Sequence, residues 1–258
     1  MQIYHNHIPR TGGNYVRNAL NQKMSDIKQL RIYTRPYGFY FCQLEKKDIE
    51  KANLISGHFG LEPEFLLGPE NLLSVTTLRD PVMRLVSHFT SNIAVFETLG
   101  NFNPNYSATP LQMFQRWIRT DKDMLSKSNM QARFLTNGLN HNLSNVNLVD
   151  SLILLQKRDG WGIGTEEPTY EAALSKIDSM FCVGTTEKID QFLARFDNKI
   201  KERIGIDLIS TDLNKANAEE STKTLYDSLT EEDIDIIKSL NQIDLRLWEY
   251  VTNSYDNA

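Results

Sequence analysis

The chain has 258 residues, of which 40% are hydrophobic and 24% are charged, and its formal net charge is −5. This composition is typical of an ordinary soluble globular protein and excludes collagen-like and disordered chains. The acidic balance argues against a surface that adsorbs nucleic acid or anionic membrane as a whole, so we expect neither as a partner. The length suits one large α/β domain, and we predict a single domain over residues 1–258.

The cysteine content and the hydropathy pattern bear on the compartment. The two cysteines, Cys42 and Cys182, lie among apolar or aromatic residues, so we expect buried thiols in a reducing environment rather than a disulfide framework. No stretch of 18 apolar residues is present to span a membrane, and the first residues do not follow the pattern of a secretory signal. We therefore predict a cytoplasmic protein. The pattern indicates no oligomeric state.

The first predicted unit is a strand, a glycine-rich turn and a helix. Residues 2–8 have the character of a short strand that Pro9 ends, and Gly12 and Gly13 follow in a tight turn. A helix is predicted from Asn14, because the apolar residues beyond it recur with a period of 3.6. Backbone N–H groups of such a turn, at the positive end of a helix dipole, favour an anion.

Side chains around this turn strengthen the anion-site hypothesis. Arg10 offers a forked guanidinium suited to phosphate or sulfate oxygens, and Thr11 and Asn14 add polar side chains. The segment does not match the G-x-x-x-x-G-K-[ST] pattern, because it has neither the leading glycine nor the Gly-Lys pair. A plain tight turn with two glycines remains the structural alternative.

A second junction of the same kind follows further along the chain. Residues 53–56 are predicted as a short strand that leads into Gly57 and His58, and residues 72–78 as a buried strand that ends before Arg79. Asp80 is a suitable helix cap, with a proline after it at the first helical position. Ser87 lies two helical turns beyond, so it shares a face with the start of the helix. A phosphate on that face would contact both the arginine and the serine.

The remaining elements complete an alternation of strands and helices. Gly184 is predicted to end a buried strand over residues 180–183, and Thr230 to cap a helix. Further helices are predicted near residues 110–119, 127–136 and 189–204, with loops at 97–110, 137–147 and 158–168. This order favours an α/β fold with a doubly wound, mostly parallel sheet flanked by helices. Ligands of such sheets bind beyond the carboxyl ends of the strands.

Two segments together resemble a known family. The segment H-I-P-R-T-G-G-N at residues 7–14 resembles the 5′-phosphosulfate-binding loop of carbohydrate-type sulfotransferases, and T-L-R-D-P-V-M-R-L-V-S at 77–87 resembles their 3′-phosphate-binding segment. The segment I-S-G-H-F at 55–59 is similar to the part of glycosaminoglycan 2-O- and 6-O-sulfotransferases that carries their proposed histidine base. Weaker similarities are found at residues 129–135, 182–187 and 212–215.

The resemblance implies a P-loop-like fold related to nucleotide kinases and a sulfuryl donor, 3′-phosphoadenosine 5′-phosphosulfate (PAPS), bound without a metal. It assigns the 5′-phosphate to Thr11, Gly12, Gly13, Asn14 and Tyr15. It assigns the 3′-phosphate to Arg79 and Ser87, and a late loop over the nucleotide to Asn214 and Lys215. Arg10 replaces the lysine of the family's loop, where it would stabilise charge on the leaving phosphate.

Sulfuryl transfer to a hydroxyl calls for a neutral base, and histidine has a suitable pKa range. His58 is the candidate, because it follows a strand and a glycine at the end where ligands bind and has the family precedent. His5 and His7 alternate along one strand and are interpreted as packing residues. No metal-ligand spacing of histidines or cysteines is present.

The leading hypothesis is thus a PAPS-dependent sulfotransferase acting on a carbohydrate or polar metabolite. The overall acidity disfavours a long polyanionic acceptor. Two alternatives stay open: a nucleotide-dependent kinase of P-loop type and a non-catalytic protein that binds PAPS or its desulfated product, 3′-phosphoadenosine 5′-phosphate (PAP).

Overall fold

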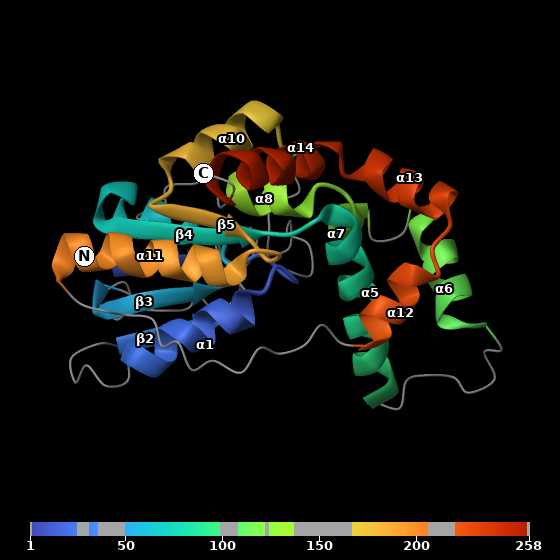
Figure 1. The fold of residues 1–258 in the computed structure, drawn as a ribbon, viewed down its shortest axis with the longest axis horizontal. Helices are drawn as coiled ribbons and strands as arrows, with labels where there is room; N and C mark the ends of the chain where they lie inside the picture. The colour runs from blue at the N-terminus through green and yellow to red at the C-terminus, as the bar shows by residue number, and fades with distance from the viewer. Residues whose placement is uncertain are drawn as a thin grey trace, which may run out of the picture.

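The computed structural model of the protein describes residues 2–24, 31–35, 50–98, 108–121, 124–136, 167–205 and 220–256. Within these residues, five strands form one sheet in the order β2-β3-β1-β4-β5, and all neighbouring strands are parallel (Figure 1). The strands are β1 (Gln2–Asn6), β2 (Arg31–Arg35), β3 (Ala52–Gly57), β4 (Leu72–Leu78) and β5 (Cys182–Thr185). The predicted α/β fold with a parallel sheet is therefore confirmed, and it is compatible with a P-loop-like architecture.

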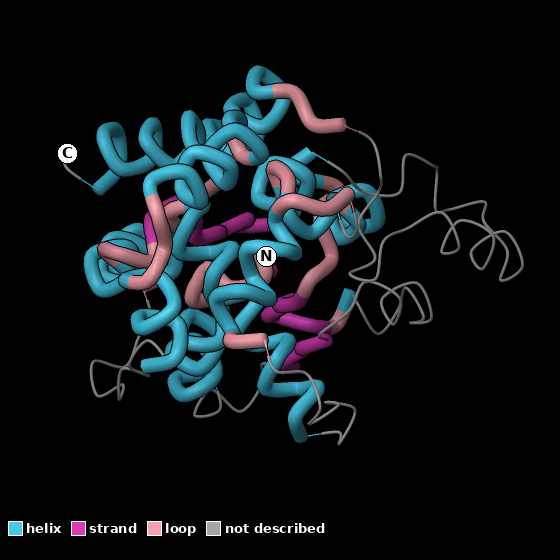
Figure 2. Tube along the Cα trace, turned by 90° about the vertical axis from the view of Figure 1, so that its right-hand side faces the viewer, coloured by secondary structure: helices cyan, strands magenta, loops and turns pink. Residues whose placement is uncertain are grey.

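Helices cover both faces of the sheet, as a doubly wound fold requires (Figure 2). One face packs against α1 (Gly13–Met24) and α11 (Ile189–Ile204). The described helices of the opposite face and of the C-terminal end are α4 (Glu62–Leu67), α8 (Met130–Thr136), α10 (Tyr170–Ser179) and α14 (Gln242–Val251), with a 3₁₀ turn at Pro69–Asn71 and a π-helical turn at Thr252–Asp256.

The two cores follow from the alternation of side chains along the strands. Ile3 and Val75 point into the core beneath α1 and α11, where Phe192 and Phe196 join them. The neighbouring Tyr4 points to the opposite face. All seven residues of β4 are buried, as expected for a strand of a parallel sheet with helices on both sides.

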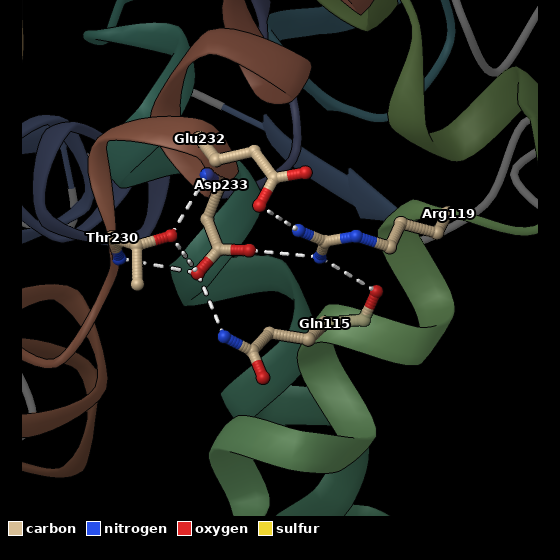
Figure 3. A network of polar contacts seen from close by, with 5 residues as sticks. All are labelled: Gln115, Arg119, Thr230, Glu232 and Asp233. Atoms are coloured by element: carbon tan, nitrogen blue, oxygen red, sulfur yellow. Dashed lines mark hydrogen bonds and ion pairs between the residues drawn. The ribbon is translucent and has the colours of Figure 1, made fainter.

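A further group of helices packs together at one end of the molecule (Figure 1). It consists of α5 (Pro81–Thr98), α6 (Pro110–Ile118), α12 (Glu220–Asp227) and α13 (Glu231–Leu240), and α7 (Met124–Lys127) leads from α6 to α8. The predicted cap at Thr230 is confirmed, since its hydroxyl accepts the N–H of Asp233 at 3.2 Å. The carboxylate of Asp233 also accepts hydrogen bonds from Gln115 of α6 and from Arg119, the residue that follows α6, each at 2.8 Å (Figure 3). We call these four residues the α6–α13 clamp.

Several predicted boundaries differ from the structure. The first strand ends at Asn6 rather than at residue 8, and the last runs over Cys182–Thr185 rather than 180–183. Gly184, predicted to end the strand, lies inside it. A glycine is needed there because Phe192 packs closely: a Cβ would lie 2.6 Å from the Phe192 Cβ. The helix predicted over 127–136 is interrupted at Asn129, whose φ is +45°. The loop at 137–147, residues 158–166 of the loop at 158–168, residues 99–107 of the loop at 97–110, and Cys42 lie outside the described residues. The ends of the segment 97–110 are helical, since α5 reaches Thr98 and α6 begins at Pro110.

The strand order indicates that the ligand crevice expected of this fold lies beside the carboxyl end of β1. The chain builds β2 and β3 on one side of β1 and β4 and β5 on the other, so the winding direction reverses at this strand. Ligands of open α/β sheets bind at such a reversal, outside the carboxyl ends of the strands. The segments that follow β1, β3 and β4 all begin there. No helix within the described ranges has the length and apolar character needed to cross a membrane.

Candidate functional site

The glycine-rich turn after β1 is held by hydrogen bonds to its carbonyl groups. The Thr11 hydroxyl donates to the Ile8 carbonyl at 2.9 Å, and the Thr77 hydroxyl of β4 donates to the Thr11 carbonyl at 2.7 Å. Both threonine side chains are buried. Because the Thr11 hydroxyl is engaged within the loop, it shapes the turn. Thr77 in turn ties this loop to the strand that carries the second predicted phosphate segment.

The N–H groups of the same turn have a different environment. Arg10 and Gly12 both have left-handed backbone conformations, with φ of +71° and +80°. The Gly12 carbonyl accepts the N–H of Tyr15 at 2.9 Å, whereas the N–H groups of Gly12, Gly13 and Asn14 take part in none of the backbone hydrogen bonds of the described residues. These amides lie at the positive end of α1, an arrangement that favours an anion. Tyr15 differs from them, since its amide is engaged in the turn.

Gly13 is required by a close approach rather than by its backbone conformation. A Cβ built at this position would lie 1.8 Å from Cδ2 of His7, so the imidazole ring of His7 occupies the space of a side chain. His7 is buried and its ring lies 4.4 Å, centroid to centroid, from the ring of His58. The His7 ring therefore lies between Gly13 of the turn and His58 at the end of β3 and packs against both.

The two arginines predicted to bind phosphates meet at the crevice. Nη1 of Arg79 donates to the Arg10 carbonyl at 3.1 Å. The Arg10 guanidinium extends to α5, where Nε and Nη2 donate to the Ser87 hydroxyl at 3.0 and 2.9 Å and Nη1 to the Ser91 hydroxyl at 3.0 Å. The structure thus brings Arg10, Arg79 and Ser87 together from three separate segments of the chain. Ser91, one helical turn beyond Ser87, was not identified from the sequence.

Burial and charges of both signs set the electrostatics around Arg79. Burial is the main cause of the lowered pKa of its guanidinium; the carboxylates of Glu187 and Asp80 raise the pKa, and the charge of Arg10 lowers it. Glu187 follows β5 and accepts the N–H of Asp80 at 3.2 Å. The guanidinium groups of Arg10 and Arg79 repel each other, and a bound dianion would relieve that repulsion. The forked donors of the two guanidinium groups, rather than a net positive charge, suit this junction to a phosphate or sulfate.

The backbone around Arg79 is fixed by elements that are distant in sequence. The carboxamide of Gln131, in α8, accepts the N–H of Arg79 at 2.8 Å and donates to its carbonyl at 2.9 Å. The Asp80 carboxylate accepts the N–H of Met83 at 2.8 Å, which confirms the predicted helix cap. Gln131 belongs to the segment 129–135, which has weak family similarity, and the sequence alone predicts no role for it.

His58 lies at the carboxyl end of β3, as predicted, and is half-buried. Its Nδ1 lies 2.5 Å from the His7 carbonyl, so Nδ1 carries the proton when the ring is neutral and Nε2 carries the lone pair. Burial is the main cause of the lowered pKa of about 4. The imidazole is therefore neutral at pH 7, the protonation state that a general base requires.

His5 and His7 are buried packing residues, as expected from the sequence. His5 is fully buried, and its ring stacks on that of His7 with a centroid distance of 5.4 Å. Burial lowers the pKa of His5 to about 3 and that of His7 well below its usual range. Asn214 and Lys215, which the resemblance placed over the nucleotide, lie outside the described residues. Of the residues described, no three histidine, cysteine, aspartate or glutamate side chains are grouped as metal ligands.

A scan of the chain against models of protein families finds no match. A search of curated proteins likewise finds no similar sequence. The hypothesis about function therefore depends on the geometry described above and on the motifs of the sequence.

Proposed function

We propose that this protein is a sulfotransferase, which moves a sulfuryl group from PAPS to a hydroxyl of a carbohydrate or polar metabolite. One observation carries the proposal. The glycine turn after β1 and the Arg79–Ser87 segment after β4 are joined through the Arg10 side chain and carbonyl. Two anion-binding groups at adjacent strand ends suit a donor that has phosphates at both ends of one ribose.

The donor fits the chemistry of the residues on the two sides of the crevice. The amides of Gly12, Gly13 and Asn14, at the start of α1, are suited to the 5′-phosphosulfate. The guanidinium of Arg79 and the hydroxyl of Ser87 are suited to the 3′-phosphate, which distinguishes PAPS from ADP and ATP. Arg10 donates to Ser87 and Ser91, so its charge lies toward the predicted 3′-phosphate side.

The transfer itself requires few protein groups. The acceptor oxygen attacks sulfur, the bond from sulfur to the bridging oxygen breaks, and that oxygen leaves with the 5′-phosphate of PAP. Nε2 of the neutral His58 ring receives the acceptor proton as the new bond forms. The His7 carbonyl holds the opposite ring nitrogen, so His7 orients the base. The amides of Gly12, Gly13 and Asn14, proposed for the 5′-phosphosulfate, favour the charge that develops on the leaving 5′-phosphate. The Arg10 guanidinium, which the resemblance assigned to that charge, is directed at α5 instead.

The absence of a Walker lysine disfavours the kinase alternative, because the equivalent charge here belongs to an arginine directed at α5. Binding and turnover are tested separately. We expect PAP to raise the melting temperature more than ADP does, and PAPS with a panel of sugars to yield a product heavier by one SO₃ group. Equal stabilisation by ADP, or by ATP with magnesium, would overturn the proposal. Binding of PAP with no product from any acceptor would favour the non-catalytic alternative.

His58→Gln tests the role of the base in the same assay. Glutamine retains a donor for the His7 carbonyl but has no site to accept a proton. We expect the variant to bind PAP as the parent protein does and to lose roughly a hundredfold in turnover, within the usual range for loss of a general base. Unchanged turnover would remove His58 from the mechanism.

A further inference from the structure

We propose that Gln131 is a positioning residue for the nucleotide site, which sets the direction of the Arg79 guanidinium by holding the Arg79 main chain. The inference rests on the proposed function, because it assumes that Arg79 binds the 3′-phosphate. Gln131 is fully buried in α8, and its carboxamide makes both hydrogen bonds that the peptide groups of Arg79 offer. It therefore acts through the arginine and need not touch the ligand.

The Arg79 main chain needs such a partner because the sheet ends just before it. The pairing of β4 with β5 ends at Leu78 and Thr185, and the pairing of β4 with β1 ends earlier, at Val75 and His5. Arg79 thus follows the last paired residue and precedes the first turn of α5. The Gln131 carboxamide offers one donor and one acceptor side by side, as a neighbouring strand would. It thereby continues the hydrogen bonding of β4 by one residue.

Gln131 is itself fixed by the C-terminal part of the chain. The Asp244 carboxylate of α14 accepts the N–H of Gln131 at 3.0 Å and that of Ala132 at 2.8 Å. The Asn129 side chain in turn accepts the N–H of Asp244 at 3.3 Å. The start of α8 is consequently anchored to the start of α14, and the carboxamide has one orientation toward Arg79.

This arrangement couples the main chain of Arg79 to its side chain. With its backbone held from α8, Arg79 directs Nη1 to the Arg10 carbonyl at 3.1 Å. Loss of the Gln131 contacts would free the peptide groups on both sides of the Arg79 Cα. The guanidinium would then no longer be held at the side of the crevice where Ser87 lies. The effect should fall on recognition of the 3′-phosphate and spare the rest of the nucleotide.

The test compares Gln131→Met with Gln115→Met, a matched change in the α6–α13 clamp that removes a carboxamide hydrogen bond far from the crevice. Calorimetric titration with PAP and with ADP gives the ratio of the two affinities. We expect Gln131→Met to reduce the ratio by about tenfold or more, since hydrogen bonds to charged groups contribute on that scale, and Gln115→Met to leave it unchanged. A ratio in Gln131→Met equal to that of the parent protein would overturn the inference.

A second variant and a measurement without ligand cover the case in which Gln131→Met does not fold. Gln131→Glu, which retains an acceptor for the Arg79 N–H but places an oxygen against its carbonyl, should lower the ratio in the same direction if Gln131→Met fails to fold. The ¹H–¹⁵N signal of the Arg79 Nε group in the nucleotide-free protein gives a readout that needs no ligand. It should move in the Gln131 variants and stay in place in Gln115→Met; an unmoved signal would overturn the inference. A parent protein without preference for PAP over ADP would instead refute the proposed function.

Discussion

Two arginines of this protein have opposite environments. Arg119, in the α6–α13 clamp, lies 2.8 Å from the carboxylate of Asp233 and 3.5 Å from that of Glu232 (Figure 3). Its pKa is raised, chiefly by the hydrogen bond to Asp233. Arg79, in the crevice, donates to a backbone carbonyl. Its pKa is lowered, chiefly by burial and also by the charge of Arg10, although the carboxylates of Glu187 and Asp80 act in the opposite direction. The ion pair thus raises the pKa of the first guanidinium, and burial lowers that of the second.

The difference separates a residue that stabilises the fold from one that is available for binding. An ion pair within the protein satisfies both charges, so the clamp needs no ligand. The Arg79 guanidinium is partly buried beside that of Arg10, so binding of a dianion would relieve both its desolvation and its repulsion by Arg10. Perturbed pKa values of this kind concentrate at functional sites.

The largest expected effect is acid destabilisation caused by the buried histidines. Their pKa values are lowered, to about 3 for His5 and His88 and to about 4 for His58, so below pH 6.5 the unfolded chain binds more protons than the folded protein. Above pH 6.5 these histidines do not lower the free energy of unfolding. As the pH falls from 6.5 toward 4, they lower it by about 3 kcal/mol or more. Urea unfolding at a series of pH values measures it.

The clamp provides the contrast in the same titration. The pKa of Asp233 is lowered to about 2, so its contribution is lost only between pH 3.8 and 2. Asp233→Asn should therefore leave the slope between pH 6.5 and 4 unchanged. A stability that is flat over that window in the parent protein would contradict the assignment of neutral, buried histidines.

Removal of the Arg79 charge should affect the nucleotide next most strongly. We expect Arg79→Met to weaken PAP binding by about a hundredfold, within the range for a lost charge-assisted hydrogen bond, and ADP binding much less. Calorimetric titration with both nucleotides measures the difference. Equal losses for PAP and ADP would mean that Arg79 does not contact the 3′-phosphate.

A methyl group on Gly13 should damage the glycine turn. Because a Cβ there would overlap the His7 ring, Gly13→Ala should cost about 2 kcal/mol of unfolding free energy and weaken PAP binding, though less than Arg79→Met does. Gly205→Ala is the control: it has a φ of +73° but open space around it, so it should cost about 1 kcal/mol and leave binding intact. If Gly13→Ala binds PAP normally, the turn does not hold the 5′-phosphate.

The sequence predicted the parts of the site that are local. The strand over Leu72–Leu78 was placed with its observed bounds, because its apolar, β-branched run ends at a polar residue and a helix cap. The turn at Gly12 and Gly13 follows from equally local chemistry. The turn is tied to β4 by the hydrogen bond from the Thr77 hydroxyl to the Thr11 carbonyl, which joins residues 66 positions apart along the chain. The local sequence pattern therefore could not predict it.

The supports of the site escaped prediction for the same reason. The break between α7 and α8 at Asn129 is stabilised by its contacts with Asn241 and Ile243, more than a hundred residues later, so helical periodicity alone did not show it. The role of Gln131 likewise depends on a partner in another element. Gln131 is buried in α8 next to apolar residues and the buried Arg133, and a buried carboxamide must find hydrogen-bond partners; the sequence shows neither this burial nor the identity of the partner.

The smallest loss of unfolding free energy is expected for a variant of the clamp arginine, Arg119, which is the counterpart of Arg79 in the comparison. Arg119→Met removes an ion pair between a partly exposed guanidinium and the buried Asp233 carboxylate, which keeps its hydrogen bonds to Gln115 and Thr230. The loss of unfolding free energy should be about 1 kcal/mol, because the arginine is partly exposed and the carboxylate retains these partners, and it should shrink in high salt. Because the charge of Arg119 is neutralised within the protein, the affinities for PAP and ADP should both stay at the parent values. A changed affinity ratio in this variant would show that the clamp and the crevice are coupled, and the separation of a structural arginine from a binding arginine would then fail.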